Sequence, residues 1–196
     1  MAYDALAESV ALIASRRVEP VRRLTRRRRF AAMAVDVAGD MAVTMFARRG
    51  VGCTWEEIHV LALRHGEWTW LGGGGSTSDS DEDLLADRRR CCPRFLSLGS
   101  DAMAGADPWA IVVNGSGGVL DDSDGTVRRG RSGRWISYAE VRVNAQVASV
   151  QVADRLLLVP WHGRVVVVWS ERRTPRVTAL DEEGQSLGEA LLPSTR

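Results

Sequence analysis

The sequence predicts a mainly β (α+β) fold, in which an N-terminal amphipathic helix covers an antiparallel meander and a β-sandwich-like set of antiparallel strands follows. Two observations lead to this fold class. Runs of β-branched and apolar residues recur along the chain, and glycine-containing turns separate them, which is typical of antiparallel hairpins. These runs are densest near the end, where we expect roughly six to eight strands in the last ~90 residues, the density of a sandwich.

The first third of the chain predicts a helix followed by a meander. Over residues 4–17, Asp4 can cap the N-terminus of a helix, and apolar residues share one stripe at Leu6, Val10 and Ile13. From residue 31 the apolar period changes from 3.6 to 2. Tight turns are expected at Gly39-Asp40 and His65-Gly66, so four strands follow one another up to Trp70.

The middle of the chain predicts a connection between two β regions. Residues 72–80 are glycine, serine, threonine and aspartate, a composition that favours a linker, and Ser80 with Asp83 resembles the capping box of a short helix over about 81–90. The sequence therefore divides into three parts. These are a helix with a four-stranded meander (1–71), a linker with a short helix (72–90) and a sandwich-like region (91–196). The two β regions can also pack as one domain.

Two features punctuate the second β region. Glycine-rich turns are expected at 114–118 and at 121–125. Apolar residues occupy odd positions from Val141 to Val147 and even positions from Ala148 to Val152. A pleated strand cannot change faces without an extra residue. The pattern therefore predicts a bulge or a sharp bend near residues 147–149, as at the corner of a sandwich.

The composition excludes several chemistries. Apolar residues make up 45% and charged residues 26% of the chain, and the formal net charge is +1, so no global field directs the protein to nucleic acid or membrane. All 26 basic residues are arginine, a bias that we attribute to a GC-rich genome. Without lysine, the chain can form neither a Walker A loop nor a pyridoxal Schiff base, and it lacks the strand lysine of protein kinases.

The cysteines and the absence of targeting segments predict a soluble, cytoplasmic protein. Cys91 and Cys92 are adjacent, and neighbouring Cα atoms are too close for an ordinary disulfide. With Cys53 they make an odd number without a framework spacing, which favours reduced thiols. Residues 25–30 resemble a twin-arginine export signal, but Asp36 ends the apolar run that follows. No segment approaches the ~18 apolar residues of a membrane span.

Two groups of residues are candidates for binding. Residues 16–29 contain eight arginines, and their guanidinium groups could hold phosphates, acidic lipid or a protein partner. The alternative is a solvated basic linker. Trp68 and Trp70 lie on one face of a predicted strand, where they form either a stacking platform or, as we interpret them, part of the core. The candidate binding residues are Arg22, Arg23, Arg26, Arg27, Arg28, Arg29, Trp68 and Trp70.

Signatures of catalysis and of metal binding are missing from the sequence. His59, His65 and His162 are isolated, and the cysteines lack the spacing of a zinc knuckle. The acidic turns fail the calcium-loop spacing, and no nucleophile elbow is present. We therefore expect no catalytic residue, no metal and no cofactor.

One stretch carries a resemblance to known proteins. Residues 163–169, Gly-Arg-Val-Val-Val-Val-Trp, and the hairpin over 175–184 resemble those that close many uncharacterised proteins of high-GC Gram-positive bacteria. This resemblance implies a bacterial source rather than a function. A helix followed by a curved meander is also similar in outline to NTF2-like folds, a likeness of element order alone.

These observations predict a non-catalytic binding or protein-interaction module. Its partner would be another protein or a second copy of the chain, bound through exposed strand edges. One alternative is a small-molecule-binding protein or enzyme with a tryptophan-lined pocket in a curved sheet, in which Glu56, Glu57 or His59 supplies the polar groups. The other is a nucleic-acid accessory protein that uses residues 16–29.

Overall fold

The computed structural model describes residues 3–77, 83–88, 110–122, 133–170 and 174–193. Its fold is mainly β, with one N-terminal helix followed by antiparallel sheets in a sandwich-like arrangement, as the sequence predicts. The helix is α1 (Ala5–Ser15). Eleven strands are described, and they form three sheets.

Sheet A contains the first four strands in chain order: β1 (Phe30–Ala38), β2 (Met41–Arg49), β3 (Thr54–Arg64) and β4 (Glu67–Thr77). Sheet B has the order β5-β6-β9, with bounds β5 (Ile111–Asp121), β6 (Arg134–Val143) and β9 (Arg164–Trp169). Sheet C has the order β11-β10-β7-β8, with bounds β7 (Ser149–Val152), β8 (Arg155–Leu158), β10 (Arg176–Leu180) and β11 (Ser186–Leu191).

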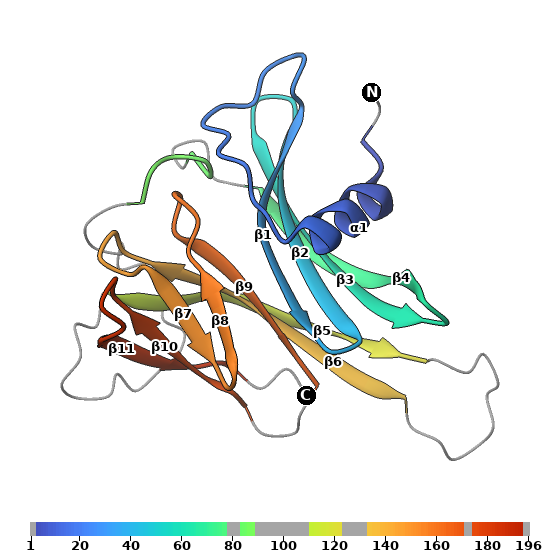
Figure 1. Ribbon diagram of the computed structural model, residues 1–196. Coiled ribbons are helices and arrows are strands. Elements are labelled where there is room, and N and C mark those ends of the chain that lie inside the picture. Colours follow the sequence, from blue (N-terminus) through green and yellow to red (C-terminus); the bar gives the residue numbers. More distant parts are fainter. Residues whose placement is uncertain (1–2, 78–82, 89–109, 123–132, 171–173, 194–196) are drawn as a thin grey trace.

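The layers are stacked as helix, sheet A, sheet B and sheet C, and Figure 1 shows α1 on the side of sheet A away from sheet C. Sheet B is central, which explains the run of four valines in β9. Val166 and Val168 pack toward sheet A, whereas Val165 and Val167 pack toward sheet C. Every residue of β9 is buried, because both faces of its sheet are covered.

Helix α1 begins where the sequence predicts. The Asp4 side chain accepts hydrogen bonds from the backbone N–H groups of Leu6 and Ala7, both at 3.1 Å, which satisfies two N–H groups that lack a partner in the helix. The helix ends at Ser15, and Arg16, the C-cap residue, has a φ of 49° in the left-handed region. Leu12 and Ile13 are buried on its inner side.

The four-stranded meander is also confirmed. Each strand pairs antiparallel with the next, and two-residue turns at Gly39-Asp40 and His65-Gly66 join β1 to β2 and β3 to β4. The turn glycines have φ values of 62° and 87°, which suits the backbone of tight hairpins.

The predicted linker at residues 72–80 is wrong for its described part, because Gly72–Thr77 belong to β4 and pair with β3. The reason is a close approach from sheet B. A Cβ at Gly74 would lie 2.5 Å from the Tyr138 hydroxyl oxygen, and one at Gly117 would lie 2.4 Å from it. The predicted turn at 114–118 is wrong as well, since it lies inside β5. Both glycine runs keep space for the Tyr138 side chain.

Two other predicted features, the helix over about 81–90 and the turn at 121–125, lie only partly within the described residues. Residues 83–88 form a turn rather than the predicted helix, and Asp83 accepts a hydrogen bond from the Leu85 N–H at 3.0 Å. The rest of that helix, at 81–82 and 89–90, lies outside the described residues, as do residues 123–125 of the predicted turn.

The bend predicted near residues 147–149 is confirmed in its main feature. β6 ends at Val143 and pairs within sheet B, whereas β7 begins at Ser149 and pairs within sheet C. The chain turns over residues 144–148 instead of forming a bulge within one strand. The change of apolar phase therefore marks a crossing from one sheet to the next.

Candidate ligand-binding pocket

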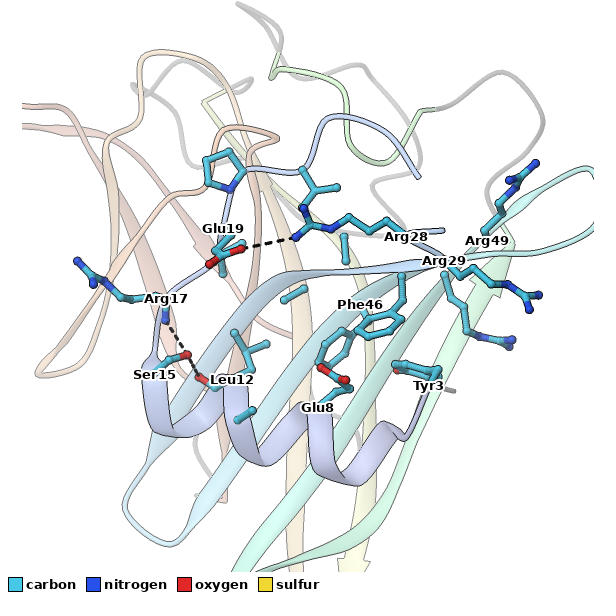
Figure 2. Close-up of a pocket in the computed structure, with 18 of the residues that line it drawn as sticks. Tyr3, Glu8, Leu12, Ser15, Arg17, Glu19, Arg28, Arg29, Phe46 and Arg49 are labelled. Carbon is cyan, nitrogen blue, oxygen red and sulfur yellow. Dashed lines mark hydrogen bonds and ion pairs between the residues drawn. The ribbon is translucent and has the colours of Figure 1, made fainter. Parts of the chain in front are cut away.

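A concave pocket of about 1040 Å³ lies between α1, the segment that follows it and the adjoining ends of β1 and β2 (Figure 2). This volume is in the range of small-molecule sites. The lining residues come from four parts of the chain: Tyr3 to Ser15 in and before α1, Arg17 to Val21 and Arg27 to Arg29 in the basic segment, Phe30 to Ala32 in β1, and Phe46 to Arg49 in β2.

The lining of the pocket is strongly basic. It contains six arginines and two glutamates, a formal excess of four positive charges. Two of the arginines are paired: Arg28 with Glu19 at 3.6 Å and Arg48 with Glu57 at 2.5 Å. The other four make no ion pair with any described residue; they are Arg17, Arg27, Arg29 and Arg49.

The basic segment is folded onto the protein. The backbone N–H of Thr25 donates to the Arg28 carbonyl at 2.8 Å, and the Thr25 hydroxyl accepts from the N–H groups of Arg27 and Arg28. Val21, 5% exposed, packs into the core between sheets A and B. These contacts hold the arginines at the pocket instead of leaving them on an unattached linker.

The end of the segment is fixed by the β1–β2 hairpin. The Arg49 N–H donates to the Arg29 carbonyl at 2.7 Å. Two arginines that make no ion pair within the described ranges therefore lie side by side, one at the end of the basic segment and one at the end of β2. Guanidinium groups are always charged and bind carboxylates and phosphates in bidentate fashion. Two adjacent arginines are therefore suited to hold an anionic group.

Three aromatic rings pack together at the other side of the pocket, where Tyr3 and Phe30 are partly exposed and Phe46 is buried. The Tyr3 ring lies 4.8 Å from that of Phe30 and 6.0 Å from that of Phe46, measured between centroids. Burial and the nearby Glu57 charge raise the pKa of the Tyr3 hydroxyl far above its usual value, so it stays protonated. The pocket thus combines cationic groups with apolar surface for a ring.

A buried polar cluster lies beneath the same helix. The Ser9 hydroxyl is 2.9 Å from the Thr44 hydroxyl and 3.0 Å from Nδ1 of His59, and Nε2 of His59 is 3.8 Å from Glu57. A serine, a histidine and a glutamate in series resemble a hydrolytic triad. Ser9, however, has no exposed surface, so it cannot reach a substrate, and the cluster anchors α1 to sheet A.

Some of the candidate binding residues predicted from the sequence line the pocket, and the others lie elsewhere. Arg27, Arg28 and Arg29 line the pocket. Arg22 pairs with Asp87 at 3.1 Å and, like Arg23 and Arg26, lies outside the lining.

The two tryptophans are outside the pocket as well. Trp68 packs on the core under α1, as expected for a core residue. The interpretation of Trp70 as a core residue is wrong, because its side chain is 40% exposed and packs on the His59 ring, with the two ring centroids 4.5 Å apart.

The polar groups proposed for a pocket in a curved sheet lie on opposite faces of sheet A. His59 and Glu57 are beneath α1, where burial lowers the pKa of His59. Glu56 instead faces sheet B and accepts a hydrogen bond from Arg164 at 2.9 Å.

Sequence reasoning missed several residues of the pocket, namely Tyr3, Glu8, Phe30, Phe46, Arg48 and Arg49. A signal for two of them was present. The two-residue turn at Gly39-Asp40 brings the start of β1 beside the end of β2, and counting outward from it would pair residue 30 with residue 49. A register shift between Ala32 and Ala34 changes the pairing by one, so Phe30 pairs with Arg48 and residues 29 and 49 lie side by side. The turn therefore indicates that the basic segment meets the end of β2, but not which residues pair there.

Comparisons with protein-family models, curated proteins and solved structures give no match. Within the described ranges, His, Cys, Asp and Glu side chains form no group of three that could hold a metal ion. Among the helices described, none is long and apolar enough to cross a membrane. Cys53 is a free thiol, and Cys91 and Cys92 lie outside the described residues.

Proposed function

We propose that the protein is a non-catalytic binding protein that holds an anionic small molecule in the basic pocket. The observation that supports this function is a set of four arginines around one concave space, none of which makes an ion pair with a residue that the structure describes. Charge-assisted hydrogen bonds from guanidinium groups are stronger than neutral ones. The volume of the pocket and the aromatic surface favour a ligand that also has an apolar part.

The experiment compares two double variants from the same segment by calorimetric titration with pyrophosphate. Arg27→Ser/Arg29→Ser removes two pocket arginines, whereas Arg23→Ser/Arg26→Ser removes the same charge outside the pocket. We expect the first variant to weaken binding at least about tenfold, because each lost contact is a hydrogen bond from a charged group. The control should stay within about twofold of the wild type.

Equal losses in the two variants would contradict the pocket. They would indicate diffuse attraction by the whole basic segment, as in the nucleic-acid alternative.

A second candidate function is self-association through the outer face of sheet C. Leu156 and Leu158 on the edge strand β8 are 59% and 81% exposed, and Leu191 on the opposite edge is 61% exposed. Exposed leucines beside a free strand edge favour contact with another chain. Light scattering tests this function. A dimer that Leu158→Asp converts to a monomer supports it, and a strictly monomeric wild type contradicts it.

A further inference from the structure

Glu8 is the feature of the pocket that a simple anion would not explain. It lies in the first turn of α1, is partly buried and lines the pocket. Figure 2 shows its side chain rising from the helix toward Phe46. Within the described chain its carboxylate has no hydrogen bond and no ion pair, although four arginines without partners line the same space.

A carboxylate at this position restricts the ligand. It repels a ligand that is anionic throughout, because like charges close together in one pocket disfavour each other. A ligand with an N–H donor at the same end would instead form a charge-assisted hydrogen bond with Glu8. The pocket is therefore complementary to a molecule with an anionic end and an N–H-bearing end.

The rings beside Glu8 define the second end further. Tyr3 and Phe30 are partly exposed and give a surface of aromatic faces and edges, and the buried Phe46 ring packs behind Tyr3. Flat heterocycles stack on such side chains regardless of their exact identity. A planar ring with N–H groups at its edge satisfies both the aromatic surface and the carboxylate.

We infer that the ligand is a mononucleotide, with its base at Tyr3, Phe30 and Glu8 and its phosphate at Arg29 and Arg49. This inference rests on the proposed function and names its ligand class. Nucleotides combine a planar ring, N–H donors and an anionic phosphate in one small molecule. The same chemistry occurs in single-stranded nucleic acid, so the experiment separates the two sources.

Three matched probes test the ligand class by calorimetry: inorganic phosphate, 1-naphthyl phosphate and AMP. The second adds a ring without N–H donors, and the third adds a base with them. We expect affinity to rise in that order, with AMP at least about tenfold tighter than phosphate.

Glu8→Ala is the decisive variant, because its effects should have opposite signs. AMP should bind roughly tenfold more weakly, since a hydrogen bond from its base to a charged group is lost. Inorganic phosphate and 1-naphthyl phosphate should bind severalfold more tightly, because a repelling charge is removed.

The matched control is Glu19→Ala, which removes the same charge from the lining and should weaken none of the probes. Glu8→Gln, which keeps an acceptor, should retain part of the AMP affinity and guards against a folding defect.

Each failure has a distinct meaning. If Glu8→Ala strengthens AMP as much as phosphate, the nucleotide assignment is wrong while the anion pocket stands. If no phosphate binds the wild type, both the assignment and the proposed function are wrong. If a ten-residue oligoadenylate binds far more tightly than AMP and Arg23→Ser/Arg26→Ser weakens it, the ligand is a nucleic-acid strand and the mononucleotide is wrong.

Discussion

The two faces of sheet B are both buried, yet they are packed in different ways. The face toward sheet C is filled by aliphatic side chains such as Val141, Val165 and Val167. The face toward sheet A contains aliphatic side chains and a network of buried charges around Arg164, which is 4% exposed. Comparing the two faces distinguishes the contacts that stabilise the stack of sheets from the contacts that fix how one sheet lies on the next.

The network connects the sheets through directional contacts. Nη1 of Arg164 lies 2.9 Å from Glu56 of sheet A and 2.5 Å from Glu140 of sheet B. Asn114 donates to the other oxygen of Glu140 at 2.6 Å. Hydrogen bonds require particular distances and angles, whereas apolar contacts do not. We expect the charged face to fix how sheet A lies on sheet B, and the aliphatic face to contribute stability without such a requirement.

A second directional contact occurs at the free edge of β9. Asp36 of β1 accepts a hydrogen bond from the Val168 N–H at 2.9 Å, and Arg155 pairs with Asp36 and donates to the Val168 carbonyl at 3.0 Å. Two side chains thus satisfy backbone groups that a neighbouring strand would otherwise pair.

The largest expected effect is the loss of the central charge. Arg164→Met leaves Glu56 and Glu140 without their shared partner, and breaking a buried pair in this way typically costs about 3–5 kcal/mol. Urea denaturation measures the change in the free energy of unfolding. The control is Arg176→Met, which breaks the exposed pair with Glu189 and should cost less than about 1 kcal/mol. Similar losses in the two variants would contradict the role of the network.

The next effect is a pH dependence specific to the charged face. His162 is buried; its Nε2 contacts the Met33 carbonyl of sheet A at 3.1 Å, and its Nδ1 accepts from the Arg164 N–H. Burial lowers its pKa to about 4. Between pH ~6.5 and ~4 the unfolded chain binds a proton that the folded chain does not, so stability is complete above pH ~6.5 and falls on acidification.

The size of this effect follows from the shift in pKa. The loss below pH ~4 should reach at most about 3 kcal/mol. Urea midpoints at several pH values should show that His162→Gln removes part of this slope. The corresponding change at His65, which lies in an exposed turn, should leave the slope unaltered. An equal slope in the wild type and the His162 variant would show that other groups cause it.

On the aliphatic face the expected effect is smaller and independent of pH. Val167 is completely buried between sheets B and C. Val167→Ala removes two methyl-sized groups and leaves a small cavity, at a cost of about 2 kcal/mol. The same loss should be measured at pH 5 and at pH 7.5, since no titrating group is altered. A loss that changes strongly with pH would contradict the separation of the two faces.

The sequence predicts the fold where the signals are local. Asp4 caps α1 through N–H groups two and three residues away, and two-residue turns set the pairing of the residues next to them in the hairpins β1–β2 and β3–β4. The change of apolar phase after Val147 marks the crossing between sheets. Each of these features depends on neighbouring residues alone, so pattern reasoning reaches them.

The missed features depend on contacts between distant residues. Arg164 and Glu56 are 108 positions apart, and no pattern in either strand indicates that they meet. In the pocket, the basic run at Arg27 to Arg29 is visible from composition. Glu8 belongs to the site only because α1 crosses the end of β2, an arrangement that packing decides. The same limit explains why the glycines of β4 resemble a linker.

The smallest expected effect tests that explanation of the glycine run. A Cβ at Gly74 would lie 2.5 Å from the Tyr138 hydroxyl but 3.7 Å from the ring carbon that carries it. Gly74→Ala should therefore cost roughly 1 kcal/mol through overpacking between sheets A and B. Tyr138→Phe removes the clashing atom, so the double variant should recover most of that loss.

The control is Gly73, where the added Cβ would meet the Ile58 carbonyl oxygen at 1.9 Å. Tyr138→Phe should therefore not rescue Gly73→Ala. Denaturation of the single and double variants gives the coupling directly, and a Gly74→Ala loss that Tyr138→Phe leaves unchanged would show that the glycines are required for another reason.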